Sequence, residues 1–424
     1  MNAETMAFLE KHCLNPGNYD PEKCALGMLE NMKAGLAGNV VDMPMIPTYL
    51  RGIQTPPANR PVMVIDAGGT NYRCALAKFD ESGCHLTYLF KDKMPGTGEP
   101  VTWEQFINFV ADSLLPMAAE TDTIGFCFSY DADITPEIDG IVCRIDKEVV
   151  VTECEGKRIG ATLSAALAER GFPGKRVLIL NDTVAALLGG AAAINVSEYS
   201  DFVGMICGTG INTCAPVDFR DIRKISLQGN GKMLINFEAG AYSGMPAGDV
   251  DAEVDAESNI PGEKLMEKMC SGVYVSKVCS AALKKSVEEG LLPESVAEKV
   301  IREMEKGGPA ADALARGLDE NHFFETQEQL NFASELAKAV FKRSAHCMAA
   351  TILAIMLLND SGNNADKPMC VCAEGSLISR SKFFLPELEQ CLKEIAQGKY
   401  HKHAVIVVGN ETTLPGSAAA ALLN

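Results

Sequence analysis

Two glycine-rich turns with threonine side chains follow apolar runs that are typical of buried strands. The first is DAGGT at 66–70, followed by Asn71 and Arg73. The second is GTG at 208–210, followed by Asn212. Glycine has no Cβ, so its backbone N–H groups can approach an anion closely, and threonine adds a hydroxyl donor. One such turn could be an ordinary hairpin, but two in matching contexts favour a polyphosphate held from both sides.

Two carboxylates stand where predicted strands end. Asp66 closes the apolar run at 62–66, a position from which it could hold a metal-bound water. Asp182 lies in LNDT at 180–183, between a predicted strand and a predicted helix, where a carboxylate can accept a proton from a substrate hydroxyl. Helix capping is the commoner role of aspartate at such a junction, but the neighbouring Thr183 would serve as a cap equally well. Catalysis is therefore favoured for Asp182.

A third pattern combines an amide with a carboxylate. Asn236 and Glu238 alternate with apolar residues in INFEAGAY at 235–242. Because a carboxylate accepts hydrogen bonds and an amide both donates and accepts them, this pair suits vicinal hydroxyl groups. A polar face on an edge strand explains the pattern equally well. Glu267, in PGEKLMEK, is weaker evidence, since most glutamates on such a helix are simply solvated.

Strands and helices alternate around these residues. Apolar runs predict strands within 62–66, 123–129, 177–182, 202–217, 368–375 and 403–410. Apolar residues at helical spacing predict helices over 103–119, 160–171 and 332–358, whereas residues 1 to about 60 are predicted to be helix and loop. This alternation is typical of a parallel or mixed α/β sheet, in which ligands bind at the carboxyl ends of the strands. Every glycine turn would lie at such an end.

The composition limits the classes of partner. The chain has 424 residues, and its 38 Lys plus Arg against 56 Asp plus Glu give a formal net charge of -18, which argues against nucleic acid and anionic membranes as partners. The 15 cysteines are scattered without a C-x-x-C pair, which suits buried thiols in a reducing cytoplasm. Neither a secretory signal nor an apolar run of about 20 residues is visible, so a cytoplasmic protein with no membrane span is expected.

Taken in order, these segments resemble the hexokinase family, in the branch of the eukaryotic-type hexokinases and glucokinase, within the actin-like ATPase superfold. DAGGTNYR resembles the family's first phosphate motif, GTGIN the second phosphate loop and LNDT the catalytic Asn–Asp pair. The segment 125–147, INFEAGAY and PGEKLMEK resemble the sugar-binding segments, while AEGS at 373–376 with LPGSAAAAL at 414–422 resembles the adenosine site. The resemblance covers nearly the whole chain.

The resemblance implies a role for each matching residue. Asp182 would be the base that accepts the proton of the sugar's C6 hydroxyl as that oxygen attacks the γ-phosphoryl group of ATP. The hexose would be positioned by Ser129, Lys147, Asn181, Asn212, Glu238 and Glu267. The nucleotide would be bound by Asp66, Gly68, Gly69, Thr70, Asn71, Arg73, Gly208, Thr209, Gly210, Gly375 and Ser376. Asp66 would also lie near Mg²⁺, through a water molecule.

The resemblance also implies a fold and an activity. Two actin-like ATPase (ribonuclease H-like) α/β domains would flank a substrate cleft, a small one over 61–180 plus 409–424 and a large one over 1–60 plus 181–408. The activity would be an ATP-dependent hexokinase that phosphorylates glucose or a related hexose at its 6-hydroxyl, the first step of glycolysis, with ATP and Mg²⁺ as cofactors. The protein would be a monomer or a homodimer.

The sequence departs from the family pattern beside the predicted sugar pocket. The departures are Tyr130, Asp131, Asp146 and Lys264. They keep two alternatives open: a catalytically inactive hexokinase-like sugar sensor, and an actin-like ATPase that acts on a protein partner. A pure sensor would need neither Asp182 nor both phosphate turns, and an ATPase acting on protein leaves the Glu238 and Glu267 segments unexplained.

Overall fold

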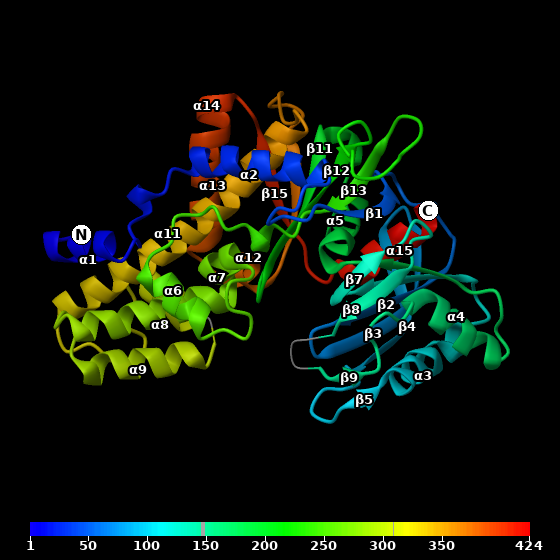
Figure 1. Ribbon diagram of the computed structural model, residues 1–424, viewed down its shortest axis with the longest axis horizontal. Coiled ribbons are helices and arrows are strands. Elements are labelled where there is room, and N and C mark those ends of the chain that lie inside the picture. The colour runs from blue at the N-terminus through cyan, green and yellow to red at the C-terminus, as the bar shows by residue number, and fades with distance from the viewer. Residues whose placement is uncertain (146–148, 308) are drawn as a thin grey trace.

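The computed structural model of the protein describes residues 1–145, 149–307 and 309–424. Lys147 and Asp146, both singled out in the sequence, therefore lie outside the described residues. The described chain forms two large β-sheets, with helices between them and on their outer faces (Figure 1). This mixed α/β architecture agrees with the predicted alternation of strands and helices.

One sheet has five strands in the order β10-β6-β2-β3-β4. Their bounds are β2 Val62–Gly68, β3 Asn71–Asp80, β4 Gly83–Lys93, β6 Thr123–Phe128 and β10 Arg176–Leu180. β10, β6 and β2 run parallel, whereas β3 is antiparallel to both β2 and β4. β2 and β6 are buried along nearly their whole length, as is usual for parallel strands covered on both faces. The three parallel strands end at one edge of the sheet.

The other sheet has six strands in the order β1-β13-β12-β11-β14-β15. Their bounds are β1 Ile46–Arg51, β11 Asp201–Cys207, β12 Ile211–Asp218, β13 Lys232–Asn236, β14 Met369–Glu374 and β15 Ala404–Val408. β11, β14 and β15 run parallel, and the remaining pairs are antiparallel. Both sheets thus combine a parallel set of strands with an antiparallel hairpin.

Strand β1 corrects the prediction that residues 1 to about 60 are helix and loop. It is an edge strand that pairs with β13, and a register shift separates its pairs at Pro47 and Arg51. Pro47 has no N–H to donate, and Tyr49 has a left-handed φ of 57°. The local sequence therefore carries no clear strand pattern, and pairing with a distant segment makes β1 a strand.

Two helices lie between the sheets, α5 Asp182–Ala192 and α15 Thr413–Leu423 (Figure 1). α5 packs on β11 and β14, α15 packs on β2 and β6, and the two helices pack against each other. A Cβ at Gly416 would lie 1.8 Å from the carbonyl oxygen of Ala185, and one at Gly189 would lie 2.1 Å from that of Thr412. The glycines therefore let the helices meet backbone to backbone, and this contact joins the two sheets.

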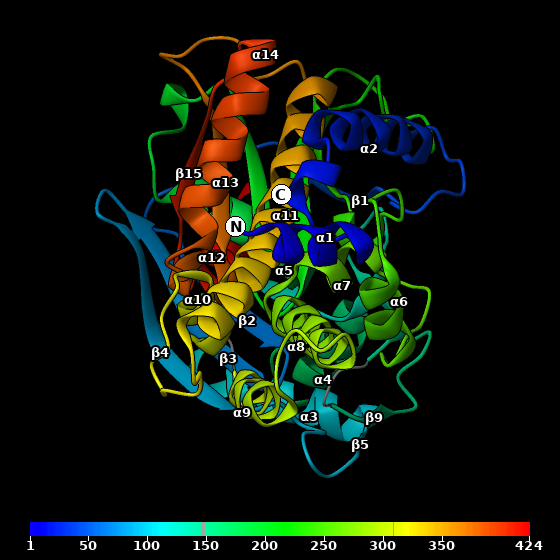
Figure 2. The same ribbon diagram turned by 90° about the vertical axis from the view of Figure 1, so that its left-hand side faces the viewer.

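The remaining elements lie outside this centre. The five-stranded sheet is covered by α3 Trp103–Leu114 and α4 Ile159–Glu169, and two short ribbons pair β5 Val101–Thr102 with β9 Val151–Thr152 and β7 Asp131–Ile134 with β8 Gly140–Arg144. A helical layer extends from the other sheet (Figure 2). It contains α1 Ala3–Lys11, α2 Pro21–Leu36, α6 Asp249–Ala256, α7 Leu265–Cys270, α8 Gly272–Glu288, α9 Glu294–Glu305, α10 Pro309–Ala315, α11 Gln327–Leu358, α12 Ser376–Arg380, α13 Phe384–Leu392 and α14 Gly398–Tyr400.

Helix α11 confirms the long helix predicted over 332–358. Among the described residues it is the one helix that is long and apolar enough to cross a membrane by length and composition. It packs against α2, α10 and α13, and 83% of its most apolar stretch is buried within the protein. Its apolar side chains therefore form part of the core.

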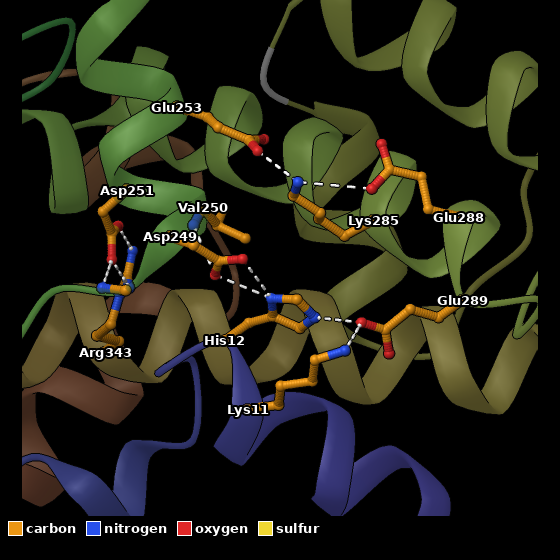
Figure 3. Close-up of polar contacts among 11 residues, drawn as sticks. Lys11, His12, Asp249, Val250, Asp251, Glu253, Lys285, Glu288, Glu289 and Arg343 are labelled. Atoms are coloured by element: carbon orange, nitrogen blue, oxygen red, sulfur yellow. Dashed lines mark hydrogen bonds and ion pairs between the residues drawn. The ribbon is translucent and has the colours of Figure 1, made fainter.

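Ion pairs tie the helical layer together (Figure 3). His12, which follows α1, places Nδ1 2.9 Å from Asp249 Oδ1 and Nε2 2.9 Å from Glu289 Oε1. Arg343 of α11 has no exposed surface, and its Nη1 and Nη2 groups donate to the Asp251 carboxylate at 2.8 and 2.6 Å. Helix α6 carries both aspartates and is thereby fixed to α1 and α11, which lie far from it in the sequence.

Candidate active site

The parallel strands of both sheets bring some of the residues of the predicted motifs to one pocket. Asp66, Ser129 and Asp182 lie at or just beyond the carboxyl ends of β2, β6 and β10. Together with the ends of β11 and β14 they line a pocket of about 500 Å³, which we call the acidic pocket. Its lining includes Asp66, Gly68, Asn71, Arg73, Ser129, Asp182, Ile206, Glu374, Gly375, Glu411 and Thr413. The pocket thus joins residues of both sheets, as expected for ligand sites of α/β folds.

Asp66 is buried at the base of the acidic pocket. Its Oδ2 atom accepts hydrogen bonds from Arg73 Nε at 3.1 Å and from Thr413 Oγ1 at 3.0 Å. Arg73 also donates to Glu411 Oε1 at 3.1 Å. The predicted phosphate ligand Arg73 therefore lies in the pocket but is paired with two carboxylates, so an incoming anion must compete with them. Sequence reasoning missed Thr413 and Glu411, whose place depends on the packing of α15.

The first glycine turn is held by contacts from the neighbouring strand. Gly69 has a left-handed φ of 58°, and a Cβ at Gly68 would lie 3.0 Å from Ser129 Oγ. The hydroxyl of Tyr130 donates to the carbonyl oxygen of Gly69 at 2.5 Å. Tyr130, one of the departures in the sequence, thus fixes the backbone of this turn. The carbonyl oxygen of Thr70 accepts from the N–H of Met94 at 2.9 Å.

Asp182 is the first residue of α5 and does not cap it. The cap is Asn181, whose side-chain oxygen accepts from the N–H of Thr183 at 2.9 Å. The capping interpretation of Asp182, and of Thr183 as its substitute, is therefore wrong. Thr183 Oγ1 instead donates to Asp182 Oδ1 at 3.2 Å. A carboxylate at a helix N-terminus is stabilised by the helix dipole, and here it lines the acidic pocket.

Glu238 lies at the centre of an amide and carboxylate network. Asn212 Nδ2 and Asn236 Nδ2 donate to Glu238 Oε1 at 3.0 and 2.9 Å, and Asn212 Nδ2 also donates to Asn236 Oδ1 at 2.8 Å. β13 lies between β1 and β12, so the edge-strand interpretation of this segment is wrong. Asn236, which the sequence pairs with Glu238 but leaves out of the predicted site, belongs to this network.

The surroundings of Glu238 carry several charges. Burial raises the pKa of Glu238, and the ammonium of Lys264 opposes that rise. The carboxylates of Asp182 and Asp131 raise the pKa of Glu238 further. The carboxylates of Glu238 and Asp182 therefore interact electrostatically. Glu238 follows β13 of the six-stranded sheet, whereas Asp182 follows β10 of the five-stranded sheet. This coupling connects the Glu238 network to the acidic pocket.

Glu267 supports the second glycine turn. Its Oε2 atom accepts from the N–H of Ile211 at 3.0 Å, and a Cβ at Gly210 would lie 2.6 Å from the same oxygen. The prediction that it binds a sugar stays untested, but it is not simply a solvated residue of α7. Its contact fixes the backbone that carries Asn212.

A second pocket of about 730 Å³ is lined mainly by residues of the helical layer and by Thr209 of the second glycine turn, and we call it the helical pocket. Its lining includes Thr209, Gly272, Lys277, Ser280, Ser376 and Arg380. The N–H of Gly272 donates to the carbonyl oxygen of Gly208 at 2.7 Å, which packs α8 on the turn. The helical pocket contains Ser376 and the acidic pocket contains Gly375, so the two pockets meet at consecutive residues.

The acidic pocket suits a polyanion only if a cation accompanies it. Its lining holds the carboxylates of Asp66, Asp92, Asp182, Glu374 and Glu411, against the cations Arg73 and Lys91. Within the described ranges, no three His, Cys, Asp or Glu side chains are grouped so that they could hold a metal ion by themselves. These carboxylates therefore fit a divalent cation that a polyanionic ligand brings with it.

Comparison with known proteins shows which protein family the chain matches. Two sequence models, both described as hexokinase, match residues 15–192 and 202–423. The chain is 27% identical over 420 residues to hexokinase-1 of Schizosaccharomyces pombe, and the match covers 92% of this chain and 84% of that protein. It is 27% identical over 379 residues to the hexokinase HKDC1 of Homo sapiens, and the match covers 83% of this chain and 41% of that protein.

Solved structures give the same result for the fold. A hexokinase from Schistosoma mansoni complexed with glucose has a TM-score of 0.76 and 20% sequence identity, and the match covers 99% of this chain and 98% of that one. Another crystal structure of a hexokinase has a TM-score of 0.81 and 19% identity over all of both chains. The predicted fold class is confirmed. The chain spans only 41%, 58% and 59% of the length of three curated relatives, from Homo sapiens, Saccharomyces cerevisiae and Oryza sativa.

Proposed function

The chain belongs to the hexokinase family, and from this membership we propose that it is an ATP-dependent hexokinase. It would transfer the γ-phosphoryl group of ATP to the 6-hydroxyl of glucose or a related hexose. The observation that carries the proposal is the position of Asp182, which lines the acidic pocket beside Gly68 of the first turn and Gly375 of the adenosine-site motif. The glucose bound by the Schistosoma mansoni relative supports a hexose as acceptor.

The two pockets together would offer a path for the nucleotide. The adenosine would occupy the helical pocket, next to Thr209 and Ser376. The phosphates would pass Gly375 into the acidic pocket, where they would compete with Asp66 and Glu411 for the guanidinium of Arg73. Such a site needs alignment and charge stabilisation more than covalent chemistry, because the transition state of phosphoryl transfer is loose.

The acceptor sugar would lie between Asp182 and the Glu238 network. Asn212 and Glu238 would orient neighbouring hydroxyls, since together they offer both donors and acceptors. Asp182 would accept the proton from the 6-hydroxyl as its oxygen attacks the phosphorus atom.

The residues present fit Mg²⁺ as a partner of the nucleotide. Asp66 would hold it through water, since its Oδ2 atom already accepts from Arg73 and Thr413. When bound, the cation neutralises charge on the phosphate oxygens. The acidic lining of the pocket then becomes compatible with ATP, so removal of the cation with a chelator is expected to abolish turnover.

The remaining parts of the proposal follow from the same family membership. The reaction would be the first step of glycolysis, and burial of most cysteine thiols supports a reducing cytoplasm as the location. The division into a small domain over 61–180 plus 409–424 and a large domain over the rest stays a prediction. It is supported by the packing of α15 on β2 and β6.

A panel of acceptors tests the proposal. ATP consumption with Mg²⁺ would be measured with glucose, mannose, fructose and galactose, and without sugar. We expect ADP release that depends on at least one hexose. Sugar binding without ATP turnover would instead indicate a sensor. ATP hydrolysis that no sugar changes would indicate an ATPase acting on another partner.

Gly375 provides a prediction for the nucleotide path. Its φ is 128°, and a Cβ there would lie 2.4 Å from the carbonyl oxygen of Cys207 and 2.7 Å from the nitrogen of Gly208. Gly375→Ala must therefore push the two loops at Gly208 and at Gly375 apart. We expect a loss on the order of 100-fold in kcat/KM for ATP, with hexose affinity retained.

A matched glycine separates the clash from backbone strain. Gly174 also has a left-handed φ, of 80°, but a Cβ there would meet nothing within 4 Å. Gly174→Ala should keep the kcat/KM for ATP of the wild type. Equal kinetics for Gly375→Ala and the wild type would show that the two loops do not form the nucleotide path.

A further inference from the structure

Lys264 brings a cation to the Glu238 network. The residue immediately precedes α7, and its Nζ atom lies 4.0 Å from Glu238 Oε2. Glu238 Oε1 already accepts from Asn212 and Asn236, so Lys264 faces the other oxygen of the same carboxylate. The contact therefore lies at the position assigned to the hydroxyls of the acceptor sugar.

The backbone at this ion pair is unusual at both ends. Lys264 has a φ of 49° and Glu238 a φ of 54°, so both residues adopt the left-handed conformation that residues other than glycine avoid. Such strain persists only where the surrounding structure determines it, and it is common at functional sites. Helix α7 holds Lys264 in place through its own packing, because the N–H of Lys268 donates to the Lys264 carbonyl oxygen at 3.2 Å. The fold thus directs the ammonium toward Glu238.

Two carboxylates of the described residues act on Glu238 together with Lys264, and one of them, Asp131, lies 3.5 Å from the guanidinium of Arg144. Asp182 of α5 and Asp131 of β7 both act on Glu238 electrostatically, and Lys264 opposes them. Three carboxylates in a partly buried site would attract a cationic ligand, because Coulomb interactions are much stronger there than in water. An anionic sugar would be repelled by the same carboxylates. The selective effect of Lys264 therefore concerns cationic and neutral acceptors.

We propose that Lys264 is a specificity-determining residue that excludes acceptor sugars carrying an ammonium group and so restricts the site to neutral hexoses. The inference rests on the proposed function and names its substrate class. A sugar ammonium beside Glu238 would have to displace Lys264 or lie next to it, and such a juxtaposition of like charges discriminates between ligands. A neutral hydroxyl meets no such repulsion and can donate to the acceptor positions of Glu238 that remain.

The test is the ratio of kcat/KM for an amino sugar to kcat/KM for glucose. Glucosamine and 3-amino-3-deoxyglucose would be the probes, because they carry the ammonium group on two neighbouring ring carbons. At pH 6.5 an amine with a pKa of about 8 is charged. We expect Lys264→Gln to raise this ratio at least about tenfold for one probe, and Lys264→Arg to keep the low ratio of the wild type.

The pH dependence of the ratio gives an independent readout. Between pH 6.5 and 9 the amine loses its charge, so the wild-type ratio should rise. For Lys264→Gln it should stay level or fall, because the carboxylates of Glu238, Asp182 and Asp131 then no longer gain from a cation. A purely structural role of Lys264 would change kcat/KM equally for glucose and for the amino sugar. The ratio for Lys264→Gln would then equal that of the wild type at every pH.

The outcomes separate this inference from the proposed function. Glucose turnover with an unchanged ratio in Lys264→Gln overturns the role of Lys264 and leaves the hexokinase proposal standing. A wild-type ratio that is already as high as that of Lys264→Gln has the same meaning. Absence of both turnover and calorimetric binding for every hexose overturns the two proposals together. A raised ratio in Lys264→Gln that Lys264→Arg restores supports the inference.

Discussion

The Asp182→Asn variant is expected to lose hexose phosphorylation by a factor of about 10² to 10⁴ in kcat, the range that a positioned general base contributes. Asparagine keeps the shape of the side chain but cannot take the proton of the acceptor hydroxyl. The start of α5 should survive, because Asn181 supplies the cap. The KM for hexose should change little, since Glu238 and Asn212 remain. Steady-state kinetics at saturating ATP measures both quantities.

A first-turn carboxylate of another helix provides the control. Glu104 is exposed in the first turn of α3, so Glu104→Gln removes the same kind of helix-dipole interaction without touching the acidic pocket. It should retain the kcat of the wild type. Undiminished ADP release by Asp182→Asn would contradict the assignment of Asp182 as the base.

The Asp251→Asn variant is expected to lower the free energy of unfolding by about 3 to 5 kcal/mol, the typical effect of breaking a buried ion pair. Arg343 is fully buried, and its Nη1 and Nη2 groups donate to the two oxygens of Asp251 (Figure 3). Burial is the largest single effect and lowers the pKa of Arg343, but the charges of Asp251 and Tyr19 and the hydrogen bonds to Asp251 together raise that pKa. The variant would therefore leave a buried guanidinium beside a neutral amide. Denaturant unfolding followed by circular dichroism measures the loss.

Two further variants make this prediction specific to the buried pair. Asp251→Leu combined with Arg343→Met removes both charges and should recover most of the stability, because apolar residues can replace a buried pair. Glu298→Gln breaks an exposed pair with Arg302 on α9 and should leave the unfolding midpoint almost unchanged. An Asp251→Asn midpoint equal to that of the wild type would show that the pair does not hold α6 on α11.

The sequence predicted the strands and turns that carry the phosphate side of the site. Apolar runs ending in DAGGT, LNDT, GTG and AEGS become β2, β10, β11 and β14, whose carboxyl ends bring Asp66, Asp182 and Gly375 to one pocket. The phosphate side could be predicted because parallel, buried strands have a local sequence pattern, a short apolar run followed by glycine. The position of a ligand site at strand ends then follows from the sheet itself.

Features that depend on long-range contacts could not be predicted from the local sequence. β1 is a strand only because it pairs with β13, and Thr413 reaches Asp66 only because glycines let α15 pack on α5. The sequence offered Asp182 or Thr183 as the helix cap, but the cap is the adjacent Asn181, a residue type that caps helices equally well. A shift of one residue decides which side chain turns back to the helix and which enters the pocket.

The sugar side of the site was predicted only in outline. Glu238 was singled out, but its partners Asn212 and Asn236 come from adjacent antiparallel strands whose register no local pattern fixes. The contact between Lys264 and Glu238 further requires left-handed backbone at both residues, which their side chains do not favour. The residues in which the sequence departs from its family therefore needed the structure before they could be interpreted.

Identification of the reaction product tests the central claim most directly. Phosphorus NMR would follow ATP, Mg²⁺ and glucose incubated with the wild-type protein and with Asp182→Asn. The account predicts one hexose 6-phosphate for each ADP formed by the wild type, and almost none with the variant. Inorganic phosphate formed at the same rate with or without glucose, or a phosphoryl group on another hydroxyl, would contradict it.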